Sequence, residues 1–137
     1  MDLLLAAKSL ADRVEAEAIK AKVPVSVSVV DIHGNLVLQH RMNGAPAFSM
    51  EISQRKAYTS ALIGVRTADL DALVQPGQSL YALLSMAGGR YTAMAGGVPL
   101  KHKGMLFAGV GVSGGTTVED VAIVHAALES IAPTNDE

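Results

Sequence analysis

The spacing of apolar side chains changes along the chain, and each spacing predicts a different secondary structure. Residues 2–22 place apolar side chains at helical intervals, which predicts a first helix that Asp2 caps and Pro24 ends. Residues 25–31 and 36–42 alternate apolar and polar side chains instead, with a glycine-containing turn between them. This alternation predicts a β-hairpin.

The next expected helix, from about Phe48 to Val65, carries apolar side chains on two sides. A polar strip runs between these sides, formed by Ser49, Ser53, Lys56 and Ser60. Burial of both apolar sides would fit a second layer of the fold or a contact between subunits.

The second half of the chain is predicted to contain shorter elements. In order, we expect a short helix, a type II turn, a second helical piece, three strands and a final helix, at residues 67–74, 75–78, 79–86, 90–95, 98–100, 104–113 and 116–131. Gly109 and Gly111 share one face of the last strand, which leaves a flat strip where a helix or a ligand can approach the backbone closely. Thr116 and Glu119 form a capping-box pattern for the final helix.

This order of elements predicts the α+β class. The five expected strands do not alternate with helices as the strands of a parallel sheet do, so we expect an antiparallel sheet flanked by helices. With 137 residues the chain is long enough for a sizeable core, and residues 1–137 are expected to form a single domain.

Composition and charge narrow the classes of partner. Half of the residues are hydrophobic, 18% are charged and the formal charge is −2, so no nucleic-acid partner is expected. No apolar run reaches membrane-spanning length and residues 1–18 lack a cationic leader, so no membrane association and a cytoplasmic location are expected. A chain this small and this apolar is expected to cover part of its surface in an oligomer.

No metal site is expected from the sequence. It contains no cysteine, and its four histidines lack the spacing of a metal-binding pair on a helix. His33 and His102 are expected in solvated turns and His125 on the packed face of the final helix. His40 follows the apolar face of its strand, where a hydrogen-bonded core histidine is expected. One imidazole suffices for an axial bond to haem, so the composition permits haem without indicating it.

Residues 109–115 match two glycine motifs by spelling alone. Their first six residues spell the G-x-G-x-x-G of dinucleotide sites, but the one helix that follows leaves no βαβ unit to complete such a site. The last five spell the G-x-S-x-G of a nucleophile elbow, but only Asp120 and His125 follow, both on the next helix. Neither a dinucleotide site nor a serine hydrolase is therefore expected.

The same turn is a candidate anion-binding site. Backbone N–H groups at a helix start, together with nearby hydroxyls, can bind a carboxylate or a phosphate. The candidate residues are Ser113, Gly114, Gly115 and Thr116. The alternative, which we favour, is a plain strand-to-helix turn with a helix cap.

Two cations form a further candidate site. Arg41 ends the second strand and Lys56 lies on the polar strip of the following helix, so both would reach one anionic group if that helix folds back over the strand. Arg41 would bind the anion with a bidentate fork and Lys56 as a point charge. The alternative is a solvated strip, or ion pairs with Asp31, Glu51 or a neighbouring subunit.

Several of these stretches together resemble one family, and they cover nearly the whole chain in order. They are VVDIHGNLVLQHRMNGA, SQRKAYTSA, QPGQSLYALL, AGGVPL and GVGVSGGTTVED. The chain resembles the GlcG-like, or haem-binding-protein-like, family, whose domain also occurs as the C-terminal part of PduO-type cobalamin adenosyltransferases. The resemblance implies a profilin-like antiparallel sheet flanked by helices, and assembly into dimers or larger rings.

The resemblance also bears on function. It implies haem or another tetrapyrrole as a ligand of some members, bound through a histidine in or near the first helix, but residues 2–22 contain no histidine. Asn43 stands where the family has an aspartate beside Arg41, and this removes a charge from the candidate site.

We therefore expect a homo-oligomeric small-ligand-binding protein, accessory to bacterial metabolism. Its ligand would be haem or another tetrapyrrole, or a small organic acid. The acid would be held by Arg41, Asn43 and Lys56 together with the turn at Ser113, Gly114, Gly115 and Thr116. One alternative is an isomerase, lyase or hydratase acting on a small carboxylate, with Lys56 or His40 as the proton carrier. Another is a purely structural subunit.

Overall fold

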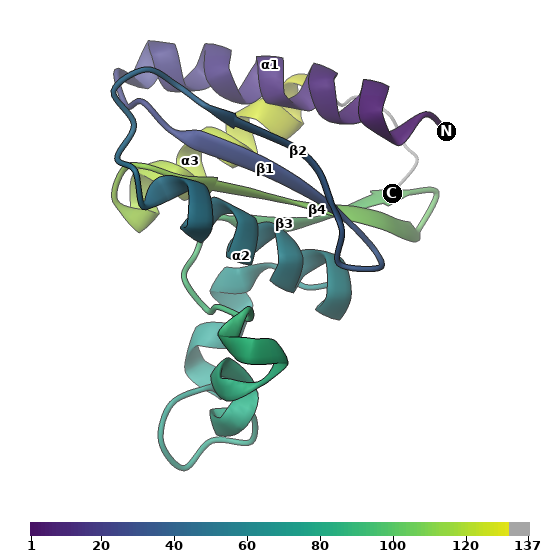
Figure 1. Cartoon of the computed structure of the whole chain (residues 1–137), viewed down its shortest axis with the longest axis vertical. Coiled ribbons are helices and arrows are strands. Elements are labelled where there is room, and N and C mark those ends of the chain that lie inside the picture. Colours follow the sequence, from purple (N-terminus) through teal and green to yellow (C-terminus); the bar gives the residue numbers. More distant parts are fainter. Residues whose placement is uncertain (132–137) are drawn as a thin grey trace.

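The computed structural model describes residues 1–131 and shows one antiparallel sheet between two helical layers (Figure 1). The strands lie in the order β2-β1-β4-β3, and they are β1 Ser26–Asp31, β2 Leu36–Arg41, β3 Gly97–His102 and β4 Met105–Ser113. Helices α1 (Leu3–Ala21) and α3 (Thr117–Ile131) cover one face of the sheet, and α2 (Ser49–Ile63) covers the other. The predicted α+β class is confirmed, with four strands in the described residues instead of five.

The first helix and the hairpin form as the sequence predicts. The Asp2 carboxylate accepts a hydrogen bond from the Leu5 N–H at 3.1 Å, and α1 ends at Lys22 in a left-handed conformation before Pro24. The hairpin pairs Val29 with Leu38 across its two strands. These local signals therefore specify the N-terminal third of the fold.

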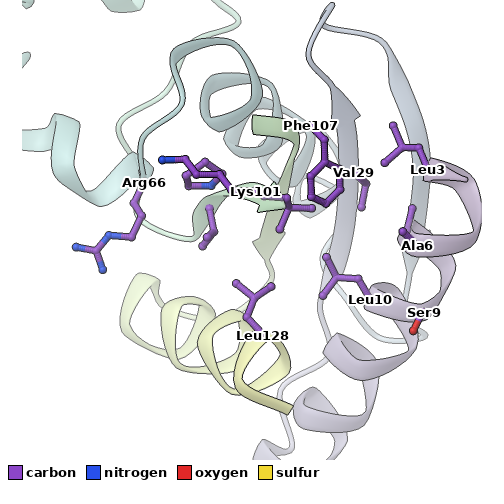
Figure 2. A pocket seen from close by; sticks show the side chains of 13 residues that line it. Leu3, Ala6, Ser9, Leu10, Val29, Arg66, Lys101, Phe107 and Leu128 are labelled. Atoms are coloured by element: carbon purple, nitrogen blue, oxygen red, sulfur yellow. The ribbon is translucent and has the colours of Figure 1, made fainter. Parts of the chain in front are cut away.

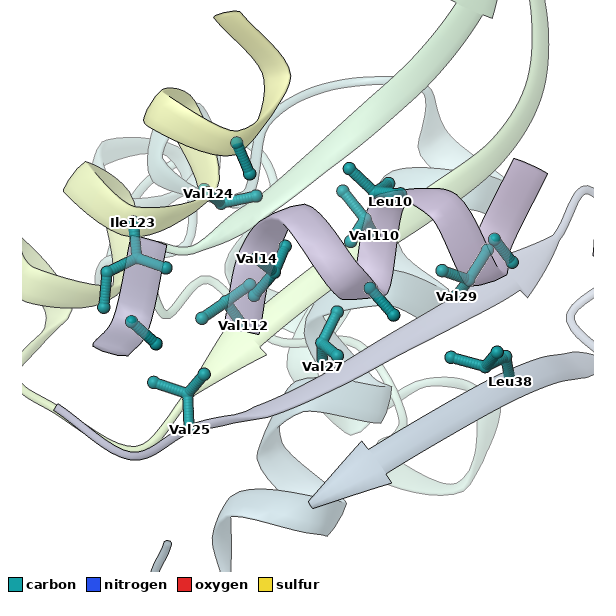
Figure 3. Packing of buried hydrophobic residues seen from close by; sticks show 14 of the residues in the cluster. Leu10, Val14, Val25, Val27, Val29, Leu38, Val110, Val112, Ile123 and Val124 are labelled. Atoms are coloured by element: carbon teal, nitrogen blue, oxygen red, sulfur yellow. The ribbon is translucent and has the colours of Figure 1, made fainter. Parts of the chain in front are cut away.

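Large apolar side chains fill the space between the sheet and the layer formed by α1 and α3 (Figure 3). This core contains Leu10 and Val14 of α1, Val27 and Val29 of β1, Val110 and Val112 of β4, and Ile123 and Val124 of α3. All of these side chains are at most 3% exposed. This layer is the main hydrophobic core.

The opposite face of the sheet is lined by small and polar side chains, and α2 packs very close to it. A Cβ atom at Gly109 would collide with the α2 backbone at Ala57 and Ala61, and one at Gly111 would collide with Ser53. The expected close approach along these glycines is confirmed, and a helix makes it. The polar strip of α2 faces the sheet and is fully buried, whereas the apolar side chain of Met50 on the same helix is exposed.

Residues 65–96 form a lobe that projects beyond α2 (Figure 1). The lobe contains the 3₁₀ helices η1 Thr67–Leu73, η2 Tyr81–Ser85 and η3 Ala87–Gly89. The type II turn is confirmed, since the Gln78 N–H donates to the Gln75 carbonyl and Gly77 has φ +84°.

The prediction of a strand at residues 90–95 is wrong. The Thr92 N–H donates to the Thr59 hydroxyl at 2.9 Å, and the Met94 N–H donates to the Thr92 hydroxyl at 3.2 Å. Side-chain oxygens thus satisfy these backbone groups, which would bond to a neighbouring strand if the segment joined the sheet.

Candidate functional site

An apolar pocket with a volume of about 540 Å³ lies between α1, α3, β3 and β4 (Figure 2). Its apolar walls include Leu3, Leu10, Val29, Pro99, Phe107 and Leu128. In Figure 2, Leu10 and Leu128 point into it from α1 and α3. The pocket therefore opens into the apolar layer of the fold, and its shape depends on elements far apart in the sequence.

Two cations line the same pocket, Arg66 before η1 and Lys101 at the end of β3. Both lie on the side of the pocket away from α1 (Figure 2). The Arg66 guanidinium is half exposed and donates to the Asp69 carboxylate at 3.0 and 3.3 Å, and this pairing raises the pKa of Arg66. Apolar walls with cations at one side suit a ligand that has an apolar body and one or more acidic groups.

The donor atoms of the pocket match an organic ligand better than an iron ion. None of the described residues that line it is His, Cys, Met or Tyr, the side chains that ligate haem iron in proteins. Within residues 1–131, no group of three or more His, Cys, Asp or Glu side chains could hold a metal ion. The described pocket lining thus offers apolar walls and two cations but none of these axial ligands for iron.

Lys56, a predicted site residue, lies in the interior of the protein. Its side chain is 0% exposed, and its Nζ donates to the Val112 carbonyl at 2.7 Å and to the Asp120 carboxylate at 3.1 Å. Burial lowers the pKa of Lys56 and raises the pKa of Asp120, and the attraction between the two charges opposes both shifts. The sequence did not identify Asp120 as the partner of Lys56. The available signal was an acidic residue on the first turn of α3 among packed apolar side chains.

Arg41 and Lys56 do not converge in the structure. The Arg41 guanidinium donates twice to the Ala45 carbonyl, at 3.1 and 2.9 Å. The reason lies in the path of α2, which packs mainly over the central strand β4, whereas Arg41 ends the edge strand β2. Within residues 1–131, neither Asp31 nor Glu51 forms an ion pair with the two cations. Lys56 pairs with Asp120, Glu51 pairs with Arg55, and the Asp31 carboxylate accepts bonds from the N–H groups of its own turn.

Arg41 instead shares an open hollow of about 580 Å³ with His40, Asn43 and Glu15. The Nδ1 atom of His40 lies 2.8 Å from the Glu15 carboxylate, and the imidazole side chain is 42% exposed. The expectation of a core histidine is therefore wrong, because β2 is an edge strand and its His40 end meets α1 at the surface. Three of the predicted site residues are nevertheless brought together here.

At the candidate anion-binding site before α3, carboxylates of the chain itself accept the backbone hydrogen bonds. The Gly115 N–H donates to Asp120 at 2.9 Å, and the Thr116 N–H donates to Glu119 at 2.8 Å. The Glu119 N–H returns a bond to the Thr116 hydroxyl, which confirms the capping box. Ser113 is 4% exposed and Gly114 adopts φ +149° beside Pro24, so the favoured capped turn is the structure observed.

The sequence did not indicate the apolar pocket or its cations. Arg66 and Lys101 lie in unrelated segments, and no local motif joins them to the apolar residues of α1 and α3. Only the folded arrangement brings these side chains together.

Within residues 1–131, no helix combines the length and the apolar character that crossing a bilayer requires.

Comparison with known proteins agrees with this fold. At 42% identity over 126 residues, the chain is similar to an uncharacterized 15.0 kDa protein from the dhaT-dhaS intergenic region of Citrobacter freundii, covering 92% of this chain and 89% of that protein. The structure is similar to Klebsiella pneumoniae protein ORFY, with a TM-score of 0.90 and 36% identity, covering 96% of this chain and 91% of that one. It is also similar to PduOC in its crystallised haem complex, with a TM-score of 0.89 and 33% identity, covering 100% of this chain and 98% of that one.

A family model described as "Haem degrading protein HbpS-like" matches residues 4–129. This match and the Citrobacter relative confirm the resemblance inferred from the sequence motifs. The chain therefore belongs to the HbpS-like family, which is related to GlcG and to the haem-binding C-terminal domain of PduO.

Proposed function

We propose that this protein binds a flat, anionic amphiphile such as haem or another tetrapyrrole in the apolar pocket. The observation that carries the proposal is the pocket itself, which combines apolar walls with cations on one side. Its volume of about 540 Å³ falls within the range of small-molecule sites, roughly 300–1,000 Å³. The similarity to PduOC, which was crystallised with haem, supports a tetrapyrrole as the ligand.

Each side of the pocket would meet a different part of the ligand. The side chains of Leu10, Phe107 and Leu128 would cover the apolar macrocycle, while Arg66 and Lys101 would bind its carboxylates by charge-assisted hydrogen bonds. Bound haem would add the redox chemistry of its iron. Because the pocket wall offers none of the usual side chains for iron, we expect the macrocycle and the carboxylates to determine the affinity.

The proposal is tested by titrating the protein with haemin and with metal-free protoporphyrin IX. Saturable binding of both compounds with similar affinity is expected, measured from the Soret absorbance and from porphyrin fluorescence. Failure of both compounds to bind saturably would overturn the proposal.

A matched pair of variants locates the site. Leu128→Glu places a carboxylate in the pocket wall, and Ala16→Glu makes the same charge change on the exposed side of α1. An unpaired charge facing an apolar ligand costs about 2 kcal/mol or more, so Leu128→Glu should lower the affinity at least roughly thirtyfold. Equal affinities for the two variants would place the ligand elsewhere.

We further infer that the protein acts as a homo-oligomer in an accessory role in bacterial metabolism. Six large apolar side chains of the lobe are exposed, and an oligomer would cover such a surface. They are Leu73, Leu80, Tyr81, Leu84, Met86 and Met94. The relatives from the dhaT-dhaS region and from PduO support the metabolic role. Sedimentation analysis of the purified protein tests the assembly, and a monomer at all concentrations would contradict it.

A second candidate function is catalysis on a small carboxylate in the hollow beside β2. The observation in its favour is the contact of His40 with Glu15, next to Arg41 and Asn43. A carboxylate that orients an imidazole is typical of a proton carrier, and Arg41 would hold the substrate. Turnover of hydroxy or unsaturated acids that His40→Gln abolishes would support this function, and no turnover across such a panel would contradict it.

A further inference from the structure

A separate group of charged side chains lies on the α2 side of the sheet, where it lines a small hollow. The hollow has a volume of about 200 Å³ and is lined by Gly34, Glu51, Gln54, Arg55, Tyr58 and Arg90. These residues come from the turn of the hairpin, from one side of α2 and from the end of the lobe. None of them lines the apolar pocket or the hollow beside β2.

Arg90 is held in position with part of its guanidinium left available. Its guanidinium carbon lies 4.6 Å from the centroid of the Tyr58 ring, and its Nε donates to the Ala87 carbonyl at 2.8 Å. The two terminal nitrogens have no hydrogen-bond partner among residues 1–131. A stacked and anchored guanidinium loses little freedom on binding, so its open fork is preorganised for a carboxylate or a phosphate.

The platform under Arg90 is itself rigid. The Tyr58 side chain is 7% exposed, and its ring centroid lies 5.4 Å from that of Tyr91. Gly34 allows the hairpin turn to approach this ring, because a Cβ atom there would lie 2.9 Å from the Tyr58 Cε1 atom. Tyr58 therefore holds Arg90 at a defined place on the wall of the hollow.

Arg55 forms the second cationic wall. Its Nη1 donates to the Gly89 carbonyl and its Nε donates to the Glu51 carboxylate at 2.7 Å. Both arginines are thus anchored by carbonyls of the same short turn, η3. With two guanidinium groups and one carboxylate on its walls, the hollow retains a net positive charge.

We propose that this hollow is a binding site for a small oxyanion, a group such as a carboxylate or a phosphate on a molecule of few atoms. The volume lies below the range of roughly 300–1,000 Å³ for drug-sized ligands, so a tetrapyrrole does not fit. Arg90 binds two oxygens of the anion with its terminal nitrogens, and Gln54 donates a hydrogen bond from its amide. The Glu51 carboxylate repels the anion, and more strongly the more negative charge the anion carries. This site does not depend on the proposed function of the apolar pocket.

The experiment titrates the protein separately with inorganic phosphate, acetate and succinate. Binding is followed by the ¹⁵Nε–H resonances of the arginines and by calorimetry. We expect saturable shifts at Arg90 and Arg55, and the order of the three affinities identifies phosphate or carboxylate as the preferred group. No saturable shift at Arg90 with any of the three overturns the proposal.

Three variants separate specific binding from a general effect of charge. Arg90→Gln should weaken binding at least roughly tenfold, as expected for the loss of hydrogen bonds to a charged group. Lys20→Gln makes the same charge change at an exposed ion pair on α1 and should leave the affinity unchanged. Glu51→Gln should tighten binding several-fold, because it removes the repulsive carboxylate and releases Arg55.

The opposite effects of Arg90→Gln and Glu51→Gln would not result from a purely structural role. Equal losses in Arg90→Gln and Lys20→Gln, or weaker binding in Glu51→Gln, would overturn the proposal. Circular dichroism confirms that each variant is folded before its affinity is measured.

Discussion

The two faces of the sheet are packed by different physical means. On the face covered by α1 and α3, branched apolar side chains such as Val110 and Val112 fill the space between strand and helix. On the face covered by α2, Gly109 and Gly111 remove the side chains and let the helix backbone approach the strand. The strand β4 supplies both patterns, because its alternate residues point to opposite faces.

The close approach of α2 changes which side chains can be buried. Serines of β1 bond to serines of α2, with Ser26 and Ser49 at 2.8 Å and Ser28 and Ser53 at 2.8 Å between their hydroxyl oxygens. A lysine is also buried on this face and paired with a carboxylate from α3. The apolar face gains its stability from the area removed from water, whereas the α2 face depends on geometry, since each buried polar group needs its partner.

The largest expected effect comes from exchanging the two kinds of packing within β4. Gly111→Val would drive a side chain into the α2 backbone at Ser53 and Ala57, so we expect a loss of more than about 4 kcal/mol of unfolding free energy. Val110→Ala, on the other face, leaves a cavity and should cost about 2–3 kcal/mol. Urea denaturation measures both, and equal losses would show that the α2 interface is more adaptable than its geometry indicates.

The buried ion pair gives the next largest effect. Lys56→Met leaves Asp120 buried without its partner and should cost about 3–5 kcal/mol. The double variant Lys56→Met with Asp120→Leu removes both charges and should recover most of that loss, because an apolar pair of similar size replaces a desolvated one. A double variant that is no more stable than Lys56→Met alone would show that Asp120 acts mainly through its bond to the Gly115 N–H.

The same pair predicts a dependence of stability on pH that the apolar face does not supply. Burial lowers the pKa of Lys56 below the unfolded value of 10.5, so its contribution to stability rises as the pH increases toward 10.5 and is lost as the pH falls through the lowered value. Burial raises the pKa of Asp120 above the unfolded value of 3.8, so its contribution is present below 3.8 and is lost as the pH rises through the raised value.

Relative to the double variant, the wild-type protein should therefore gain stability toward both ends of the pH range. Urea denaturation of the two proteins across that range measures the difference in their free energies of unfolding. If the free energies of unfolding of the two proteins followed parallel curves against pH, this would contradict the pKa shifts of Lys56 and Asp120.

Sequence patterns predicted the apolar layer well because its signals are local. The cap at Asp2, the alternation in the hairpin and the helical spacing of Leu10 and Val14 each follow from one short segment. The strand expected at residues 90–95 failed because the hydroxyl of Thr59, far away in the sequence, accepts the bond of the Thr92 N–H. A backbone segment whose partner is a distant side chain leaves no periodic signal.

The candidate sites were predicted less well, for a related reason. The sequence identified cations on β2 and α2 but not their direction, and Lys56 points inward while its neighbour Arg55 lies at the surface hollow. Which of two adjacent helical residues faces the sheet depends on the rotation of the helix about its axis. Gly109 and Gly111, on another strand, fix that rotation because the α2 backbone packs against them. The position of Arg55 and Arg90 on the walls of one hollow therefore follows from the fold and not from either segment alone.

The smallest expected effect concerns the hydroxyl pairs between β1 and α2. The Ser53 hydroxyl donates to the Met50 carbonyl at 3.0 Å, so it accepts a hydrogen bond from the Ser28 hydroxyl. The Ser28 hydroxyl in turn accepts a hydrogen bond from the Gln39 amide at 2.9 Å. Ser53→Ala leaves the buried Ser28 hydroxyl without its acceptor and should cost about 1–2 kcal/mol. Adding Ser28→Ala should cost less than it does in the wild-type background, since the pair is already broken.

A double-mutant cycle by urea denaturation measures the coupling between Ser28 and Ser53. If the α2 face is held by matched polar partners, the coupling energy is about 0.5 kcal/mol or more. A coupling energy of zero would mean that close backbone packing along Gly109 and Gly111 suffices and that the hydroxyls only fill space. In that case the two faces would differ in the size of their side chains and not in the kind of interaction that joins helix to sheet.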